Sequence, residues 1–272
     1  MLRFAINHMA VPGLDYKQLF TLAGRLGCLG VELRNDLARP LFDGDAPEEV
    51  AKVAAGHNQR IVGLSQVYPF NDWSDAVLEK VTTLIAQAKA CGAETISLIP
   101  RNDGQGLGNG ERRANLRVAL REIKPLLDEA DLVALVEPLG FEMSSLRSKA
   151  EAIEVIESLS AADRFKLVHD TFHHYLSGGG SFFASYTGIV HISGVTDSRI
   201  AISDIRDEHR VLVDENDVLG NIEQIDALLE AGYNGPFSFE PFSPAVHKLA
   251  DPEAQLRQSI DFIKARIKAA AA

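Results

Sequence analysis

Three acidic residues and one histidine each follow a separate apolar, strand-like run of this sequence. Glu137 follows LVALV and Asp170 follows FKLVH, whereas His191 follows GIV and Glu240 follows PFSF. Side chains at the ends of different strands meet when the strands run parallel in a barrel, because all of them then end at one rim. Carboxylates and a neutral imidazole are ligands for Mn²⁺, Mg²⁺, Co²⁺ or Zn²⁺. The pattern therefore predicts one divalent metal ion held by these four residues.

Each of the four residues also has an ordinary structural explanation. Glu137 precedes Pro138 and could belong to a turn, and Asp170 could cap a following helix. Four such residues at equivalent positions favour a shared site over four coincidences. The absence of cysteine from the set disfavours a closed structural zinc site. An ion held in this way keeps coordination positions for water or substrate oxygens.

Strand-like and helical patterns alternate along the whole chain. Short apolar runs predict strands at residues 3–7, 30–33, 60–65, 95–99, 132–136, 165–169, 189–192 and 237–239. Apolar residues recur with helical spacing over 16–25, 47–57, 75–90, 111–129, 149–158, 222–230 and 252–268. The segment after Asp170 has room for only a short sixth helix. Eight such units predict an α/β fold, a (β/α)₈ TIM barrel, as a single domain over residues 1–272.

The charge balance and the cysteines restrict partners and location. Lys and Arg number 27 against 38 for Asp and Glu, which gives a net charge of −11. Nucleic acid and anionic membranes are therefore not expected as partners. The N-terminal apolar stretch is too short for a signal peptide, and no run approaches the roughly 20 apolar residues of a membrane helix. We expect a cytoplasmic protein in which Cys28 and Cys91 are buried free thiols.

Longer motifs around these residues resemble a known family. Glu137, DTFHH from Asp170, VHISG with His191 and SFEPF with Glu240 resemble the xylose-isomerase-like barrel superfamily of sugar isomerases and epimerases. Within it, INHM, VELRNDL, SLIPRNDG and GNGERRANLRVALRE look most like the inosose isomerases, also called 2-keto-myo-inositol isomerases. The resemblance implies that the four residues hold the metal, Mn²⁺ foremost. It also implies that Glu137 and Glu240 act as acid and base on opposite sides of the substrate.

The implied reaction also follows from the chemistry of these groups. Moving a carbonyl along a polyol requires removal of a proton from the carbon next to the C=O group. A divalent ion chelated by the ketone and a neighbouring hydroxyl stabilises the resulting enediolate. One carboxylate takes the proton and a second group returns it to the adjacent carbon. We expect Glu240 to be the base and Glu137 its partner in an isomerase, an intramolecular oxidoreductase, that interconverts keto-inositols.

Further residues are candidates for contacts with the substrate. The resemblance implies that His173, three residues after Asp170, contacts a substrate oxygen. Glu142, five residues after Glu137, resembles a supporting acid of the related epimerases, although the spacing here is one residue shorter.

The loop after His191 also departs from the epimerases. They carry an arginine six residues after the metal histidine, where this chain has Asp197. Arg199, Arg206 and Arg210 are candidate substitutes, and the spacing does not choose among them. His209, within Asp207-Glu208-His209, either contacts the substrate or lies in a solvated turn.

Several alternative functions use the same ligands. The most favoured alternatives are a ketose 3-epimerase or a hydroxypyruvate-type isomerase acting on a small sugar. A dehydratase of keto-cyclohexanoids and a non-catalytic sugar-binding barrel are less favoured. Abasic-site endonucleases of the same barrel type hold three zinc ions with extra histidines, but this chain has Gln66 and Arg101 at those strand ends. The expected partner is a small polyol or keto-sugar, with a homo-oligomer left open.

Overall fold

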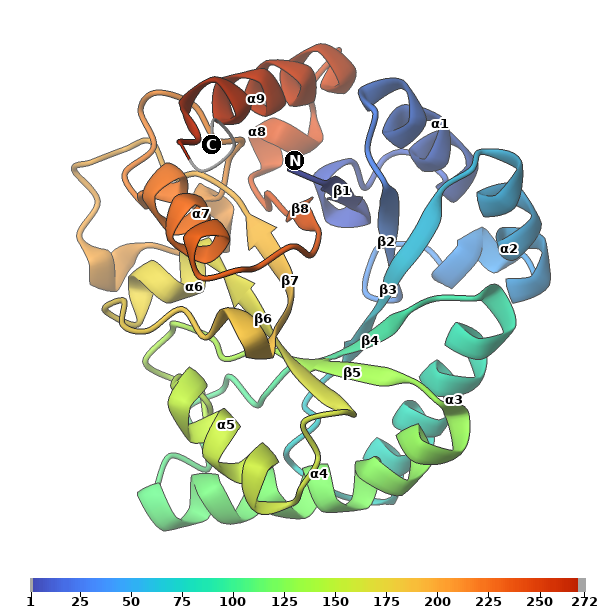
Figure 1. Cartoon of the computed structure of the whole chain (residues 1–272), viewed down its shortest axis with the longest axis vertical. Helices are drawn as coiled ribbons and strands as arrows, with labels where there is room; N and C mark the ends of the chain where they lie inside the picture. The colour runs from blue at the N-terminus through green and yellow to red at the C-terminus, as the bar shows by residue number, and fades with distance from the viewer. Residues whose placement is uncertain (1, 269–272) are drawn as a thin grey trace.

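The eight apolar runs form eight parallel strands of a closed barrel in the computed structural model, which describes residues 2–268 (Figure 1). Each strand pairs with the next, and the last pairs with the first. The strands are β1 (Phe4–Asn7), β2 (Gly30–Arg34), β3 (Arg60–Val67), β4 (Thr95–Leu98), β5 (Val133–Val136), β6 (Phe165–Asp170), β7 (Thr187–Ile192) and β8 (Phe237–Phe239). The predicted (β/α)₈ barrel is confirmed.

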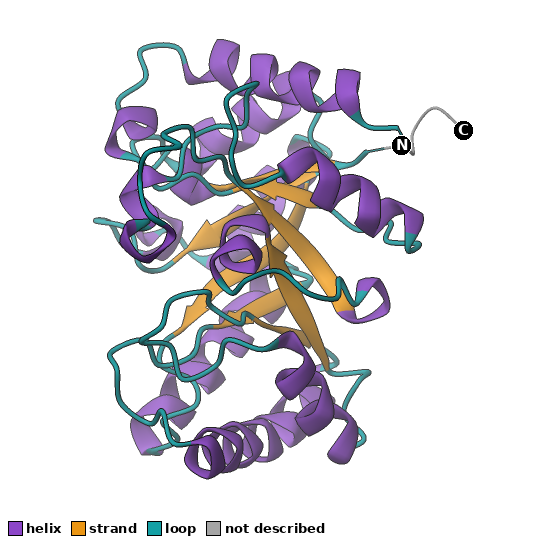
Figure 2. Cartoon of the chain, turned by 90° about the vertical axis from the view of Figure 1, so that its left-hand side faces the viewer, coloured by secondary structure: helices purple, strands orange, loops and turns teal. Residues whose placement is uncertain are grey.

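Helices surround this barrel on the outside (Figure 2). They are α1 (Tyr16–Leu26), α2 (Pro47–Gly56), α3 (Asp75–Cys91), α4 (Asn109–Ala130), α5 (Lys149–Ser158), α6 (Thr171–Leu176), α7 (Asn221–Glu230), α8 (Pro244–His247) and α9 (Pro252–Arg266). The sixth helix is short, as the sequence predicts. The four-residue α8 is not anticipated by the helical pattern, because one turn is too short to show periodicity.

Local sequence signals fix where the helices begin and end. The Ser74 side chain accepts a hydrogen bond from the Val77 backbone N–H and caps α3. Gly27 ends α1 and Gly92 ends α3, both in the left-handed conformation that glycine adopts without strain. Each of these glycines turns the chain directly into the next strand.

The inside of the barrel is apolar at its floor and polar at its C-terminal rim. The floor is a small buried cluster formed by Ala5, Val62, Leu135, Val168 and Ile189. Residues two apart in a strand point to the same side of the sheet. In four of these strands, the residue two positions after the apolar one is polar. These polar residues are Asn7, Glu137, Asp170 and His191. The alternation of the strands therefore carries these polar side chains into the barrel mouth.

A second, larger core fills the space between the strands and the helices. Cys28 and Cys91 are buried there as free thiols, which confirms that prediction. Burial raises the pKa of Cys28 to about 12 and that of Cys91 to about 11, so neither thiol is reactive at neutral pH. Within residues 2–268, no helix has both the length and the apolar character that crossing a bilayer requires.

Candidate metal centre

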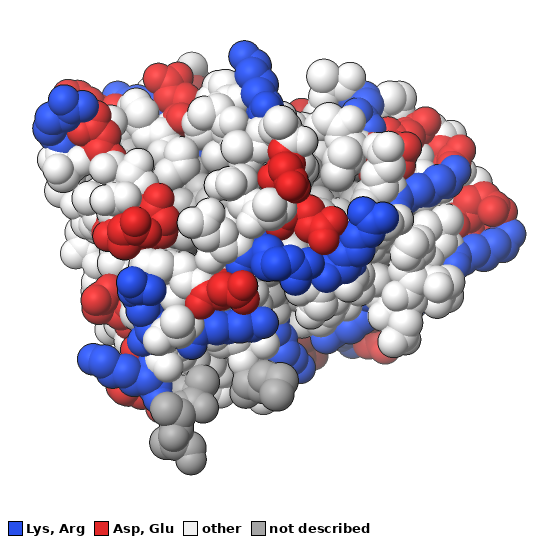
Figure 3. Space-filling model, turned by 90° about the horizontal axis from the view of Figure 1, so that it is seen from above, with Lys and Arg blue, Asp and Glu red and all other residues white. Residues whose placement is uncertain are grey.

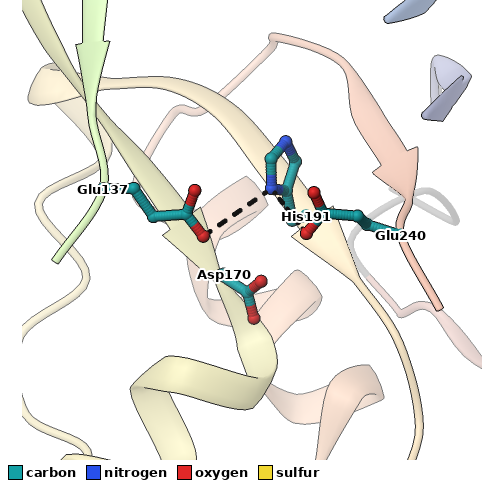
Figure 4. A group of neighbouring side chains, drawn as sticks. All are labelled: Glu137, Asp170, His191 and Glu240. Atoms are coloured by element: carbon teal, nitrogen blue, oxygen red, sulfur yellow. Dashed lines mark ion pairs between the residues drawn. The ribbon is translucent and has the colours of Figure 1, made fainter. Parts of the chain in front are cut away.

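The four residues at the strand ends form one buried cluster at the C-terminal rim of the barrel (Figure 4). Asp170 and His191 lie in β6 and β7, and Glu137 and Glu240 directly follow β5 and β8. One ligand atom from each residue lies within 4.8 Å of those of the other three. Four buried donors that converge to this degree could hold a single divalent ion.

The two ring nitrogens of His191 face different surroundings. Nδ1 lies 3.1 Å from Glu240 Oε2 and 3.9 Å from Glu137 Oε1, whereas Nε2 lies 3.1 Å from Glu32 Oε2. Nδ1 is buried and makes no well-aligned hydrogen bond among the described residues, although it lies within ion-pair distance of Glu240. Buried nitrogens without a well-aligned hydrogen bond are uncommon in proteins. A nitrogen of this kind, surrounded by carboxylate oxygens, fits a divalent metal ion.

Glu240 lies among positively charged and polar donors. Its Oε1 accepts hydrogen bonds from Arg34 Nη1 at 2.6 Å and from Asn7 Nδ2 at 3.2 Å, and its Oε2 accepts one from Arg210 Nη2 at 3.0 Å. Burial alone would raise the pKa of Glu240, but the charges of His191 and the two arginines lower it below the ordinary value. Glu240 is therefore ionised at neutral pH.

Glu137, unlike Glu240, tends to hold a proton. Burial raises its pKa to about 8, opposed by His191 and reinforced by the neighbouring charge of Glu240. Without a metal ion, Glu137 is therefore mostly protonated at neutral pH. Two nearby carboxyl groups whose pKa values are driven apart are a common arrangement for an acid and a base.

Arg210 lies in the middle of the site. Its Nη2 donates to Asp170 Oδ2 at 2.7 Å as well as to Glu240, and its Nη1 lies 3.3 Å from Asp207 Oδ1. The guanidinium carbon lies 4.8 Å from the ring centre of Phe172 and 4.6 Å from that of Phe242. Two aromatic rings and three carboxylates therefore fix its position.

His173 also faces the cavity. It lies in α6, whose first backbone N–H groups are capped by Asp170 Oδ1. The ring packs edge-on between Phe141 and Phe172, and Nε2 lies 3.9 Å from Glu137 Oε1. Burial lowers the pKa of His173, so its imidazole is neutral and can exchange hydrogen bonds with a hydroxyl group. Asp170 is thus both a cap of α6 and a member of the cluster.

A cavity of about 230 Å³ opens directly above the cluster. Its walls combine carboxylates, two guanidiniums, amides and aromatic rings, contributed by Arg34, Asp36, Ser65, Gln66, Tyr68, Ile99, Asn102, Glu137, Leu139, Phe141, His173, Asp207, Arg210, Glu240 and Phe242. Other hollows lie between helices on the outer surface and contain none of the four cluster residues. The cavity is therefore the place where a small molecule would meet the cluster.

Three residues expected to contact a substrate lie outside this cavity. Glu142 is exposed, because the preceding Phe141 directs its ring inward and the chain then turns to the surface. The Arg206 guanidinium donates to the backbone carbonyls of Ser203 and Ile205. His209 accepts a hydrogen bond from the Arg206 backbone N–H through Nδ1. None of Glu142, Arg206 and His209 therefore lines the cavity.

Of the three candidate arginines in the loop after His191, Arg210 alone lines the cavity among the described residues. Arg199 instead pairs with Asp197, at the surface. Spacing could not make this choice, because the loop between β7 and α7 has no regular period.

Asn7, Glu32 and Arg34 are parts of the site that the sequence motifs did not assign to any role. The available signal was the pattern of β2, GVELR, in which two charged residues alternate within a strand that is buried throughout. Charged side chains are rarely buried unless they are paired. Glu32 and Arg34 therefore had to meet partners inside the barrel.

The fold and the site together define the class of protein. A closed (β/α)₈ barrel carries three carboxylates and one histidine at its C-terminal rim, beneath a polar cavity. The sequence model of the xylose isomerase-like TIM barrel family matches residues 20–266. The chain belongs to this family.

Individual relatives add detail. The chain is 23% identical to an inosose isomerase of Halalkalibacterium halodurans over 203 residues, which are 71% of this chain and 70% of the relative. A crystal structure of a xylose isomerase domain containing protein from Salmonella typhimurium LT2 is 35% identical, covers 96% of this chain and 97% of its own, and has a TM-score of 0.90. The IOLI protein with a bound zinc atom shares the fold at 18% identity and a TM-score of 0.87, over 98% of this chain and 100% of its own.

Proposed function

We propose that this protein is a divalent-metal-dependent isomerase that interconverts keto-inositols, with Glu240 as the base and Glu137 as the acid. The observation that carries the proposal is the buried cluster of three carboxyl groups and one imidazole at the edge of a polar cavity, in which burial raises the pKa of Glu137 while nearby charges lower that of Glu240. The similarity to an inosose isomerase supports the choice of substrate.

The four cluster residues would hold the metal ion. When bound, a divalent ion supplies positive charge to the ketone and neighbouring hydroxyl oxygens of a substrate and so stabilises charge that develops there. The donor set contains oxygens and one nitrogen, which suits Mn²⁺, Mg²⁺, Co²⁺ or Zn²⁺. We expect Mn²⁺ as the native ion.

The protein's own groups would move the proton. Glu137 and Glu240 approach the cluster from opposite sides of the barrel mouth (Figure 4). Glu240, ionised, would take the proton from the hydroxyl-bearing carbon next to the ketone and release it to solvent, while the hydroxyl proton passes to the ketone oxygen. Because a bound ion displaces the proton of Glu137, the proton that Glu137 delivers to the former carbonyl carbon would come from solvent in the cavity. Arg34 and Asn7 hold Glu240 in place through its Oε1 atom. His173, neutral, orients a substrate hydroxyl above the cluster.

The charges of the cavity favour an uncharged substrate. Four carboxyl groups and two guanidiniums line it, and the lining is negative before an ion is added even with Glu137 protonated. Each guanidinium also has a carboxylate partner outside the metal cluster, Asp36 for Arg34 and Asp207 for Arg210. A substrate carboxylate or phosphate would therefore find no unpaired cation among these lining residues. A neutral polyhydroxy ketone fits better than an acidic one.

Nucleic acid is a poor candidate substrate for similar reasons. Gln66 and Arg101 take the places at which the three-zinc endonucleases have further histidines, and one cluster of metal ligands is found among the described residues. On the face shown in Figure 3, acidic and basic side chains are interspersed. This mixture and the net charge of −11 do not favour a phosphate backbone.

A substrate panel tests the proposal. Metal-loaded protein is incubated with 2-keto-myo-inositol, a free ketose, hydroxypyruvate and 3-dehydroshikimate, and products are followed by proton NMR and ultraviolet absorbance. We expect an isomeric ketone from 2-keto-myo-inositol without the conjugated chromophore that dehydration would create. Faster conversion of either acid would contradict the assignment.

A variant tests the role of the base. Glu240→Gln keeps the shape of the side chain and removes its basicity, so it should keep the fold and lose turnover, by at least about 10²-fold. Circular dichroism checks the fold. Substantial residual turnover would exclude Glu240 as the base.

A further inference from the structure

Glu32 is a buried carboxylate that the proposed reaction does not use. It lies in the middle of β2, its side chain points into the barrel, and it is fully buried. A carboxylate in this position has lost its hydration, so its neighbours must supply hydrogen bonds in place of water. Those neighbours show what Glu32 does.

Three side chains face the Glu32 carboxylate. Oε1 accepts hydrogen bonds from Asn7 Nδ2 and Ser238 Oγ, and Oε2 lies 3.1 Å from His191 Nε2. The orientation of the Asn7 amide is fixed, because its Oδ1 accepts from the Met9 backbone N–H and from Arg34. Asn7 must therefore present its NH₂ group, and Ser238 its hydroxyl hydrogen, to Glu32. The remaining oxygen is available for the N–H of His191.

This contact fixes which nitrogen of His191 faces the cluster. When Nε2 carries the hydrogen donated to Glu32, Nδ1 can offer its lone pair toward Glu137 and Glu240 (Figure 4). Without Glu32, the ring could rotate or carry its hydrogen on Nδ1, and neither state binds a metal ion at the cluster. A carboxylate that accepts the second N–H of a metal-binding imidazole also makes the ring a better donor.

We propose that Glu32 is a positioning residue that holds the His191 ring and directs Nδ1 toward the metal ion. This inference rests on the proposed metal site but concerns a residue outside the four ligands. Loss of such a contact weakens metal affinity by about 10- to 100-fold in other proteins. The effect should be larger than that of losing another hydrogen bond to the same carboxylate.

The test compares two variants of the full-length protein with the wild type. Glu32→Gln removes the negative charge opposite His191, and Ser238→Ala removes a donor to Oε1, the Glu32 oxygen that does not face His191. Co²⁺ affinity is measured by equilibrium dialysis, and the geometry of the bound ion by its visible absorption spectrum. Thermal melting of the metal-free proteins reports on the fold.

We expect Glu32→Gln to bind Co²⁺ about 10- to 100-fold more weakly, with an altered spectrum, and Ser238→Ala to stay within about threefold of the wild type. Equal Co²⁺ affinity of wild type and Glu32→Gln would overturn the positioning role and leave the metal site intact. A wild-type protein that binds no Co²⁺ would overturn the metal site itself, which separates the two failures.

A measurement on the wild type covers the case in which Glu32→Gln does not fold. Nitrogen-15 NMR of the Zn²⁺-loaded protein identifies which His191 nitrogen carries hydrogen. Hydrogen on Nε2 and a metal-bound Nδ1 support the proposal, whereas hydrogen on Nδ1 overturns it.

Discussion

At the scale of single residues, the site depends on how differently burial and charge act on two glutamates. Burial raises the pKa of Glu137 to about 8, while the charges around Glu240 keep its pKa low. The difference arises because Arg34 and Arg210 contact Glu240 directly, whereas the carboxylates near Glu137 repel its negative form. A metal ion would have to displace the proton from Glu137, so binding should release protons and strengthen as the pH rises.

The raised pKa of Glu137 predicts a change in the pH dependence of stability. Its pKa is about 8 in the folded protein against 4.5 for an ordinary glutamate, so the metal-free protein binds a proton more tightly when folded. Proton binding by Glu137 therefore stabilises the folded protein in full at pH values below the ordinary glutamate pKa. This stabilisation is lost as the pH rises through about 8. Glu137→Gln does not titrate. Between about pH 6 and 8 the wild type should therefore lose on the order of 1 kcal/mol more per pH unit than the variant.

Urea unfolding of both proteins in the presence of a chelator measures this difference. Exposed Glu79 provides a matched control, since Glu79→Gln should follow the wild-type profile. Parallel pH profiles for the wild type and Glu137→Gln would show that Glu137 is ionised in the metal-free protein.

At the scale of elements, the strands place the cluster and the loops complete it. Glu137, Asp170, His191 and Glu240 could be predicted from the sequence, because each ends an apolar run and the strands share one rim. Loop residues could not be placed in this way. Arg210 enters the cavity while Arg206, four residues earlier, binds backbone carbonyls, and no periodicity distinguishes them.

The loop after β5 packs closely against helix α6, so a substitution in this loop should lower catalytic efficiency without replacing a metal ligand. A Cβ atom on Gly140 would lie 2.6 Å from the His173 carbonyl oxygen and 2.5 Å from Leu176 Cβ. Gly140→Ala should therefore push α6 outward, move His173 in the cavity and lower kcat/KM by about 10- to 100-fold. Metal affinity should change less, because the four ligands stay on their strands.

Steady-state kinetics and Co²⁺ titration check this prediction. Gly110→Ala is the control, since its new Cβ would meet no atom within 4 Å beyond its chain neighbours and the backbone of α4, in which Gly110 lies. Unchanged kcat/KM in Gly140→Ala would mean that the loop adjusts without moving His173.

The junction of α5, β6 and α6 contains an unusual lysine. Lys149 Nζ lies 2.7 Å from His169 Nδ1 and 3.0 Å from His174 Nδ1, and burial lowers its pKa to about 7. Lys17 is instead exposed at the surface and paired with Asp45, which raises its pKa. We expect the rate of carbamylation by cyanate at Lys149 to reach half its maximum near pH 7, and that at Lys17 to keep rising beyond pH 10. Peptide mass spectrometry distinguishes the two sites. Matching pH profiles of carbamylation at Lys149 and Lys17 would refute the lowered pKa of Lys149.

At the scale of the whole molecule, the polar rim lies above buried apolar clusters. One cluster forms the floor of the barrel, a larger one fills the layer between strands and helices, and a third lies around α6. The buried charges of the metal cluster and its partners lie instead at the C-terminal mouth. The alternating pattern of strands and helices predicted this architecture, since eight β-α units close a barrel. The partners of Glu32 could not be predicted, because they come from strands that lie far apart in the sequence.

The most direct test of the account is a comparison of metal-loaded and chelated protein acting on 2-keto-myo-inositol in D₂O, followed by proton NMR. With Mn²⁺, we predict that an isomeric ketone accumulates and that the signal of the hydrogen next to the carbonyl declines. Both changes should stop after chelation and return when Mn²⁺ is restored. Isomer formation at the same rate after chelation, or neither product nor exchange with the ion present, would contradict a metal-dependent keto-inositol isomerase.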